Sequence, residues 1–251
     1  EMLPHYRYMV IHSDLYPVHG GFVNWLSEGL GIVSFTNELW SEKRITQNGT
    51  NGLPDEAARM RWQDRVLFGQ THSDWTEVDH PEFGKVLVGG GTKYSRRTPP
   101  PFMLEEEAHR NFAFTMFHAS EMPVLRLNEI LVTDLGDNVW QVDLEIANDR
   151  IIQTRLAHAA SKGIGLPDFL SFEPGGGTKV LLAGPATNRF AKTFDPVEFQ
   201  PARFKVEDGI KGRSISTFRY ILASDGPPSG TFQYEATKAA DLTIPLEVVV
   251  E

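Results

Sequence analysis

Residues 16–39 read YPVHGGFVNWLSEGLGIVSFTNEL, and this stretch sets the interpretation of the first half of the chain. Its two adjacent glycines predict a turn. Residues 22–29 follow as a short helix that stops at a glycine, and the β-branched and aromatic residues 32–36 favour a strand. Upstream, residues 8–11 read as a short buried strand. Strand, glycine turn, helix and strand in this order predict an α/β fold.

Composition limits the classes of function. The chain has 251 residues, of which 41% are hydrophobic and 23% charged, as expected of a globular protein with a real core. Its net charge of −9 argues against binding to nucleic acid or to an anionic membrane surface. The absence of cysteine excludes disulfides, thiolate zinc sites and cysteine nucleophiles. No run approaches the roughly 18 apolar residues of a membrane span.

Residues 41–119 mix turns with two predicted helices. Residues 41–54 are polar and contain two Asn-Gly turn signals, and residues 55–68 are compatible with a helix. A second helix is predicted over residues 103–119, after a run of three prolines. Its three consecutive glutamates, 105–107, are expected in the first turns, where the helix dipole favours negative charge.

From about residue 120 onward, apolar side chains recur at every second position, which is typical of strands. The stripes comprise Trp140, Val142, Leu144 and Ile146; Phe218, Tyr220 and Leu222; Phe232, Tyr234 and Ala236; and Leu242, Ile244, Leu246, Val248 and Val250. Short strands separated by turn signals predict an all-β, immunoglobulin-like sandwich. We therefore divide the chain into an α/β domain, residues 1–119, and a β-sandwich domain, residues 120–251.

The opening stretch resembles the zinc carboxypeptidase family, the carboxypeptidase A-like metallopeptidases. In that family a tyrosine is followed by a Gly-Gly turn, an Asp-Trp pair, a glycine and a strand reading Phe-Thr-x-Glu-Leu. Nine positions fall in register here within 24 residues: Tyr16, Gly20, Gly21, Trp25, Gly29, Phe35, Thr36, Glu38 and Leu39. The resemblance covers residues 6–119 and implies that they form the C-terminal part of a catalytic domain with a mixed sheet.

The resemblance also implies a role for four residues. Glu38 would be the general base that takes a proton from a metal-activated water as the water attacks a peptide carbonyl. Tyr16 would close over the bound peptide, Val23 would set side-chain specificity, and Thr36 would line the same pocket. An apolar Val23 argues against a preference for C-terminal Lys or Arg. The alternatives are a salt-bridged structural carboxylate for Glu38, a half-buried aromatic for Tyr16 and simple packing for Val23.

Some features depart from the family pattern. Asn24 stands where the family has Asp, and Pro17 follows the tyrosine. The family's zinc ligands, a His-x-x-Glu pair and a later His, lie upstream of the tyrosine, and no His-x-x-Glu occurs here. We therefore expect zinc as the cofactor of the intact enzyme, with its ligands in a half that precedes residue 1 and no metal ligand in this chain. Less favoured is a naturally degenerate, non-catalytic relative.

The eight histidines suggest no replacement site. His5 and His12 lie too close to the tyrosine to match the third ligand, and His19 has no metal-binding companion in the sequence. His72 and His80 bracket acidic residues, for which a solvated loop is favoured over a surface metal site. His109 and His118 are too far apart on the second predicted helix to share a metal. His158 is expected on the surface of a strand.

Two other classes of function were weighed. No Gly-x-Ser-x-Gly elbow supports a serine hydrolase, and the glycine runs at residues 89–91 and 175–177 lack phosphate-loop spacing and indicate hairpin or connecting loops. The second class is a non-catalytic binding or anchoring module formed by the sandwich. Trp140 and Tyr234 lie on inward stripes and are expected in the core rather than on a sugar platform.

The resemblance implies a peptide substrate and an exported, periplasmic or extracellular parent protein whose signal peptide is not in this chain. Because the chain opens at Glu1 and runs at once into apolar sequence, we expect a trimmed piece of a longer polypeptide. Loss of an upstream half would expose a sheet, so we expect association with that half or with a second copy.

Overall fold

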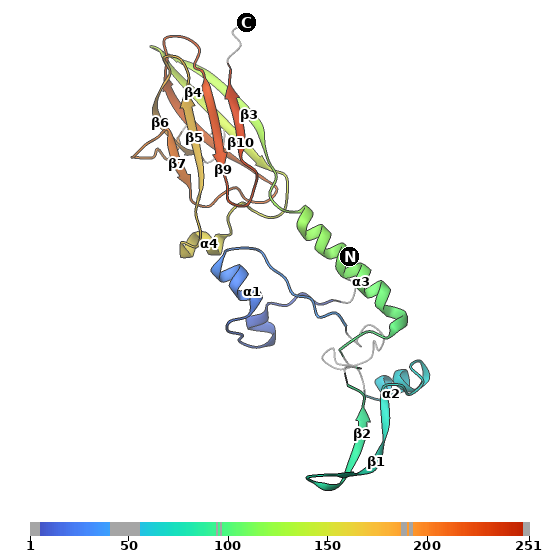
Figure 1. The fold of residues 1–251 in the computed structure, drawn as a ribbon. Helices are drawn as coiled ribbons and strands as arrows, with labels where there is room; N and C mark the ends of the chain where they lie inside the picture. Colours follow the sequence, from blue (N-terminus) through green and yellow to red (C-terminus); the bar gives the residue numbers. More distant parts are fainter. Residues whose placement is uncertain are drawn as a thin grey trace. The chain divides into compact units, whose positions relative to one another are not determined.

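A computed structural model describes residues 6–40, 56–93, 95, 97–186, 190 and 193–247 and divides the chain into two compact units (Figure 1). The N-terminal unit comprises residues 1–18 and 36–117. The sandwich unit comprises residues 19–35 and 118–251. The sandwich unit thus includes part of the 16–39 stretch, which the sequence alone assigned to the first domain.

The N-terminal unit contains two helices, a π-helical turn and a β-hairpin among its described residues. In chain order these are η1 (Ile11–Leu15), α2 (Glu56–Arg65), β1 (His72–His80), β2 (Gly84–Gly91) and α3 (Pro101–Ser120), of which α3 continues into the sandwich unit for its last three residues. The predicted helices over residues 55–68 and 103–119 are confirmed by α2 and α3. Because α3 begins at Pro101, the glutamates at 105–107 lie beyond its first turn, and their predicted dipole role is wrong.

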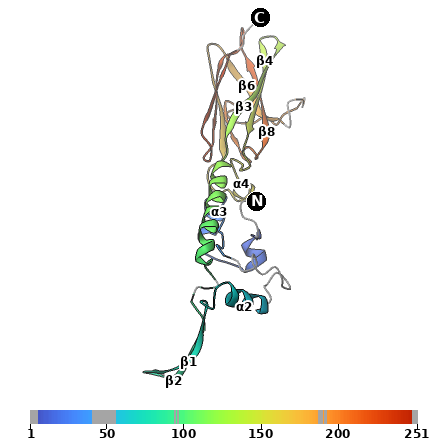
Figure 2. The ribbon, with the colours of Figure 1, turned by 90° about the vertical axis from the view of Figure 1, so that its right-hand side faces the viewer.

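β1 and β2 pair antiparallel as a two-stranded ribbon. Figure 2 shows the ribbon from a second direction. The glycine run at residues 89–91 lies in β2 and not in the predicted loop. Gly89 is required there because a Cβ at this position would lie 2.7 Å from the Cα of Trp75 on the neighbouring strand. The close approach falls beside an irregularity in the ladder, between Ser73 and Thr76.

The sandwich unit confirms the predicted β-sandwich. Its strands are β3 (Leu125–Gly136), β4 (Val139–Asn148), β5 (Asp168–Pro174), β6 (Lys179–Ala186), β7 (Arg203–Val206), β8 (Ser214–Ala223), β9 (Gly230–Glu235) and β10 (Leu242–Leu246). They form two four-stranded sheets, ordered β3-β4-β8-β6 and β10-β9-β5-β7, and every pair of neighbours is antiparallel (Figures 1 and 2).

The core lies between the two sheets and is strongly aromatic. Alternate residues of β4 and β8 point into it from one sheet, and alternate residues of β5 and β9 point into it from the other. Ring centroids lie 4.4–6.3 Å apart through the set Phe172, Phe204, Phe218, Tyr220, Phe232 and Tyr234. The described residues of the predicted stripes therefore form the core or pack against it, and Tyr234 is fully buried as predicted.

The opposite face of β4 and β8 carries a buried ion pair. Arg219 donates two hydrogen bonds to Asp143, of 2.7 and 2.9 Å, and both side chains are almost inaccessible to solvent. The hydrogen bond and the carboxylate charge raise the pKa of Arg219, so the guanidinium stays charged. The ring of Phe194 lies 5.9 Å from this guanidinium and covers it. The pair ties the two central strands of the sheet together on their outer side.

Residues 19–35 fold as a short helical segment within the sandwich unit. α1 (Phe22–Asn24) continues directly into the π-helical turn η2 (Trp25–Gly29), which confirms the predicted short helix and its end at a glycine. The chain then reaches Gly31, whose φ of +62° suits glycine. A Cβ at Gly31 would lie 2.8 Å from Cβ of Ala159 in α4 (Ala157–Lys162).

Three local predictions were wrong. Residues 8–11 are irregular up to Val10 and then enter η1, and residues 32–36 are extended but pair with no strand among the described residues. β-branched and aromatic side chains favour an extended backbone, but a strand also needs a neighbour to accept its hydrogen bonds. His158, expected on a strand, lies in α4 instead. The mixed α/β sheet expected over residues 1–119 is not among the described elements, and residues 248–251 of the last predicted strand lie outside them.

Among the helices that the structure describes, none is both long enough and apolar enough to pass through a bilayer.

Candidate functional site

Tyr16 lies at the end of the π-helical turn η1. Its amide donates to the carbonyl of Ile11 at 3.1 Å, and Asp14 accepts a hydrogen bond from the amide of Val10 at 2.8 Å, which closes the turn. The Tyr16 side chain is 65% exposed. It is therefore available to a ligand, and the alternative of a half-buried aromatic does not fit.

Val23 lies in α1 and is half-buried. Its carbonyl oxygen accepts hydrogen bonds from two serine hydroxyls, Ser27 at 2.9 Å and Ser34 at 3.1 Å. The second bond joins the helix to the extended chain that leads toward Thr36. The backbone around Val23 is thus fixed by local side chains, as a residue that sets specificity would need to be.

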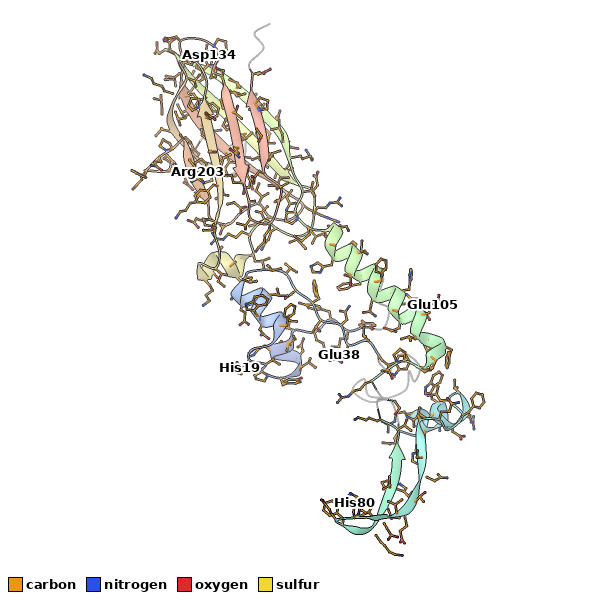
Figure 3. All side chains as sticks on the ribbon, in the orientation of Figure 1. His19, Glu38, His80, Glu105, Asp134 and Arg203 are labelled. Carbon is orange, nitrogen blue, oxygen red and sulfur yellow. The ribbon has the colours of Figure 1, made fainter. Side chains whose placement is uncertain are left out.

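Thr36 and Glu38 lie in the extended segment 36–40, and both are exposed. Figure 3 labels Glu38 on this segment. The neighbouring Asn37 is half-buried and donates from Nδ2 to Oδ1 of Asn111 in α3, at 2.9 Å. The sequence suggested a carboxylate flanked by apolar side chains in a central strand. In the structure Glu38 is in contact with solvent and the segment has no strand partner among the described residues.

The four predicted site residues do not lie in one unit. Tyr16, Thr36 and Glu38 belong to the N-terminal unit, and Val23 belongs to the sandwich unit. Within the described residues, no hydrogen bond joins Glu38 to Tyr16 or Thr36. The four residues therefore lie on three segments: Tyr16 after η1, Val23 in α1, and Thr36 and Glu38 together in residues 36–40.

Two of the described histidines, His80 and His118, contact neighbouring residues. In the hairpin, Nδ1 of His80 accepts from the amides of Glu82 and Phe83 at 3.2 and 3.3 Å, so this ring closes the turn (Figure 3). His118 packs edge-on against Phe35, with ring centroids 5.0 Å apart. His19 is exposed, and His5 lies outside the described residues. No three His, Asp or Glu side chains in the described part of the chain come close enough together to hold a metal ion.

A buried polar cluster on α3 was missed at the level of sequence. Glu107 is only 3% exposed, although the sequence was interpreted only as placing it with Glu105 and Glu106 in the first turns of the helix. Its carboxylate accepts a hydrogen bond from the hydroxyl of Tyr6 and another from Nδ2 of Asn111, at 3.2 Å. Glu107 and Asn111 are four residues apart, so they lie on one face of the helix. The four-residue spacing of Glu107 and Asn111 is the signal in the sequence, but the helix also carries other polar residues such as Glu106 and Arg110, so the spacing alone did not single out this pair.

A second buried polar cluster lies in the sandwich unit. Asp168 is fully buried, and its Oδ2 accepts hydrogen bonds from the hydroxyls of Thr154 and Tyr234, the latter at 2.9 Å. Burial raises the pKa of the Asp168 carboxyl, against the opposing effect of the two hydroxyls and of the cations Arg155 and Lys238. Lys238 in turn donates to the carbonyl of Gly31, so the cluster also holds residues 19–35.

Comparisons with known proteins do not identify a family for this chain. No protein-family model matches the chain, and no curated protein matches it. Among solved structures the chain is similar to a β-glycosidase from Bacteroides vulgatus, at 14% identity and a TM-score of 0.26, over 78% of this chain and 27% of that one. The chain therefore spans about a quarter of that protein's length, and a likeness this weak carries no argument about fold or function.

Proposed function

We propose that this chain carries the C-terminal part of a zinc metallocarboxypeptidase domain, with a mixed α/β sheet in the intact domain, followed by an accessory immunoglobulin-like sandwich. One observation carries the proposal: the nine residues in register between Tyr16 and Leu39, including the Gly-Gly turn and the Phe-Thr-x-Glu-Leu sequence. Motif spacing over 24 residues is far more specific than any single glycine pair or glutamate. The proposed substrates are peptides with a free C-terminus.

Glu38 is the proposed general base. A base must lie within hydrogen-bond reach of the water whose proton it takes, either directly or through one intervening water. Glu38 is exposed in the structure and lines neither the groove near β6 nor the pocket at Trp40, so the motif spacing alone supports this role. Tyr16, also exposed, is the proposed clamp on the bound peptide. Trp40 of the segment 36–40 lines a pocket of about 170 Å³ whose lining does not include Glu38, so a complete site would need a further surface to enclose this carboxylate.

Zinc is the proposed cofactor of the intact enzyme, but the described residues do not fit it. A catalytic zinc site takes three protein ligands from His, Asp, Glu or Cys, and no such group occurs in the described part of the chain. The proposal therefore requires zinc ligands from outside these residues, and it places them upstream of the tyrosine, as in the family. What this chain supplies is the carboxylate, the clamp and the specificity pocket.

The proposal extends to specificity, partner and compartment. An apolar Val23 in the proposed specificity position, with Thr36 further along the same motif as a second pocket residue, favours substrates with an apolar C-terminal side chain. The N-terminal unit exposes large apolar side chains such as Phe68, Trp75 and Phe83, which supports association with the rest of a catalytic domain or with a second copy. An exported location follows from the family resemblance alone.

The test is a peptidase assay on the protein encoded by the full gene, with peptides that end in Phe, Leu, Lys or an amide. We expect release of the apolar C-terminal residues and no cleavage of the amidated peptides. Glu38→Gln should lower kcat by about 10²- to 10⁴-fold, the usual contribution of a general base, with the bound zinc unchanged. Glu28→Gln is the matched control, because Glu28 is an exposed glutamate of the same motif. Equal activity of Glu38→Gln and wild type would contradict the proposal.

A second candidate function, a non-catalytic binding module, is favoured by a groove in the sandwich unit. The groove has a volume of about 460 Å³ and lies where the start of β6 meets the chain leading into β7. Its lining includes Lys179, and also Arg203, which is ion-paired with Glu235 at 2.9 Å, beside apolar residues such as Val180 and Pro201. Such a groove at the side of a sandwich can hold an extended, anionic polymer.

Pull-down of the 251-residue chain with insoluble peptidoglycan or polysaccharide tests this candidate. We expect retention that decreases in Lys179→Ala and not in the control Lys211→Ala, an exposed lysine away from the groove lining. If neither peptidoglycan nor polysaccharide retains the chain, the binding-module candidate is contradicted and the peptidase proposal is the one that remains.

A further inference from the structure

The side chain of Glu107 is buried, although a glutamate on a helix is usually exposed. It is the one buried residue of α3, all of whose residues the structure describes, while aromatic and thioether side chains of the same helix, Phe112 and Met116, are 62% and 54% exposed. A carboxylate is almost never fully buried unless it has hydrogen-bond partners. The helix therefore places a polar group in the interior at the expense of an apolar one, which points to a specific contact.

That contact joins two segments that are distant in the sequence. Tyr6 donates its hydroxyl proton to the Glu107 carboxylate. Nδ2 of Asn111 lies 3.2 Å from this carboxylate, 3.2 Å from the Tyr6 hydroxyl and 2.9 Å from the Glu107 carbonyl. With both amide protons of Asn111 used in this way, its Oδ1 is left to accept, and it accepts from Nδ2 of Asn37 at 2.9 Å. Helix α3 thus holds residue 6 and residue 37 through one connected network.

The network fixes the direction of Glu38. In an extended chain successive side chains point to opposite sides. Asn37 is half-buried against α3, and Glu38, the next residue, is exposed. Holding Asn37 on the helix therefore turns the Glu38 carboxylate away from it. Loss of the bond between Asn37 and Asn111 would let the segment rotate and would release this constraint.

We infer that Asn111 and Glu107 are positioning residues, which hold the segment 36–40 so that Glu38 faces outward. Asn111 acts on the segment directly, and Glu107 acts through Asn111 by orienting its amide. The catalytic consequence rests on the proposed function of Glu38; the anchoring itself does not. A base displaced by about 1 Å can cost on the order of 100-fold in rate, so the expected signature is a lower kcat with little change in KM.

The anchoring is tested on the 251-residue chain with a protease that cleaves after glutamate. Cleavage after Glu38 reports how freely the segment moves, and cleavage after Glu28, an exposed glutamate of the sandwich unit, is the internal reference. We expect Asn111→Ala and Asn37→Ala each to accelerate cleavage after Glu38 about tenfold, with no change after Glu28. The double variant should be no faster than either single variant, because both remove the same bond.

Three further variants separate this role from general destabilisation. Glu107→Gln keeps an oxygen that can accept from Tyr6 and Asn111, and it should retain slow cleavage, whereas Glu107→Leu should not. Phe112→Ala changes an exposed side chain of the same helix and should leave both sites as in wild type. Equal cleavage after Glu38 in wild type and in both Asn→Ala variants would overturn the inference.

The catalytic arm uses the protein from the full gene. If wild type releases C-terminal residues, Asn111→Ala should lower kcat about 10- to 100-fold at nearly unchanged KM. An unchanged kcat in an active enzyme would overturn the positioning role. A full-length protein without peptidase activity would instead contradict the proposed function, and faster cleavage after Glu38 in Asn111→Ala would still support the anchoring.

Discussion

The two units differ in where their apolar side chains lie. The sandwich unit encloses a continuous core of aromatic and aliphatic residues between its sheets. In the described part of the N-terminal unit, Trp40 is the one buried aromatic or aliphatic side chain, while Phe68 and Phe83 are 82% and 73% exposed. The sandwich therefore contains the source of its own stability, and the N-terminal unit shows contacts that are mainly local or polar.

This difference corresponds to two kinds of sequence pattern: a periodicity that specifies a whole domain, and a motif that belongs to a larger site. A sandwich is specified by its own alternating stripes, which need no partner outside the domain. A segment that belongs to a larger sheet or site is different, because its motif residues contact other segments that its own sequence does not reveal. The exposed apolar side chains of the N-terminal unit are the observation behind the proposed association.

The largest expected effect tests this contrast directly. Phe232 is fully buried, and its ring centroid lies 4.4 Å from that of Phe172 and 5.0 Å from that of Tyr220. Phe232→Ala should lower the free energy of unfolding of the sandwich by about 3–5 kcal/mol, through lost burial and the cavity that remains. Phe83→Ala, in the exposed hairpin turn, should change it by less than about 0.5 kcal/mol. Denaturant unfolding of both variants measures the difference, and similar losses would contradict the contrast.

The sequence predicted the sandwich well and the N-terminal unit only in part. Alternation over Trp140–Ile146 and Phe218–Leu222 is a direct consequence of strand geometry, so it located the core. Residues 32–36 were predicted as a strand from the same propensities, but a strand depends on a partner that the segment does not have among the described residues. The β-propensity of these residues correctly predicted an extended backbone. It carries no information on whether a neighbouring strand is present.

The candidate site shows the same limit. Motif spacing selected Glu38, yet its surroundings depend on Asn111, which is 73 positions further along the chain, and on Glu107 and Tyr6. Hydrogen bonds between residues so far apart leave no periodic pattern in a single sequence. The predicted roles of Glu38, Tyr16, Val23 and Thr36 stay predictions, because no described contact tests them.

A smaller effect is expected at the polar groups inside the sandwich core. The Tyr234 hydroxyl donates to Asp168 at 2.9 Å, whereas the Tyr220 hydroxyl is buried without a hydrogen-bond partner in the structure. Tyr234→Phe should destabilise the chain by about 1–3 kcal/mol, because it leaves the buried carboxylate with one donor fewer. Tyr220→Phe removes an unsatisfied hydroxyl and should be neutral or stabilising. Thermal and denaturant unfolding of this matched pair would contradict the interpretation if Tyr220→Phe were the more damaging change.

The smallest effect concerns the pH dependence of the same cluster. Burial raises the native pKa of Asp168 above its ordinary value of 3.8, so the native state prefers the protonated carboxyl. As the pH rises from about 3.8 through the raised native value, the unfolded chain ionises first, and the contribution of Asp168 to stability falls; above that value the loss is complete and constant. Asp168→Asn has no such titration. Its free energy of unfolding relative to wild type should therefore increase across this window, to an extent that the opposing hydroxyls and cations reduce.

Denaturant unfolding of wild type and Asp168→Asn between about pH 4 and pH 7 measures this change, with Asp208→Asn as the control for loss of an exposed charge. A wild type that gains stability over Asp168→Asn as the pH rises would mean that Thr154, Tyr234 and the nearby cations outweigh burial. The ionised carboxylate would then stabilise the sandwich. In that case the polar cluster, which also holds residues 19–35 through Lys238 and Gly31, would be a source of stability in addition to the apolar core. The contrast between the two units would then rest on more than the burial of apolar side chains.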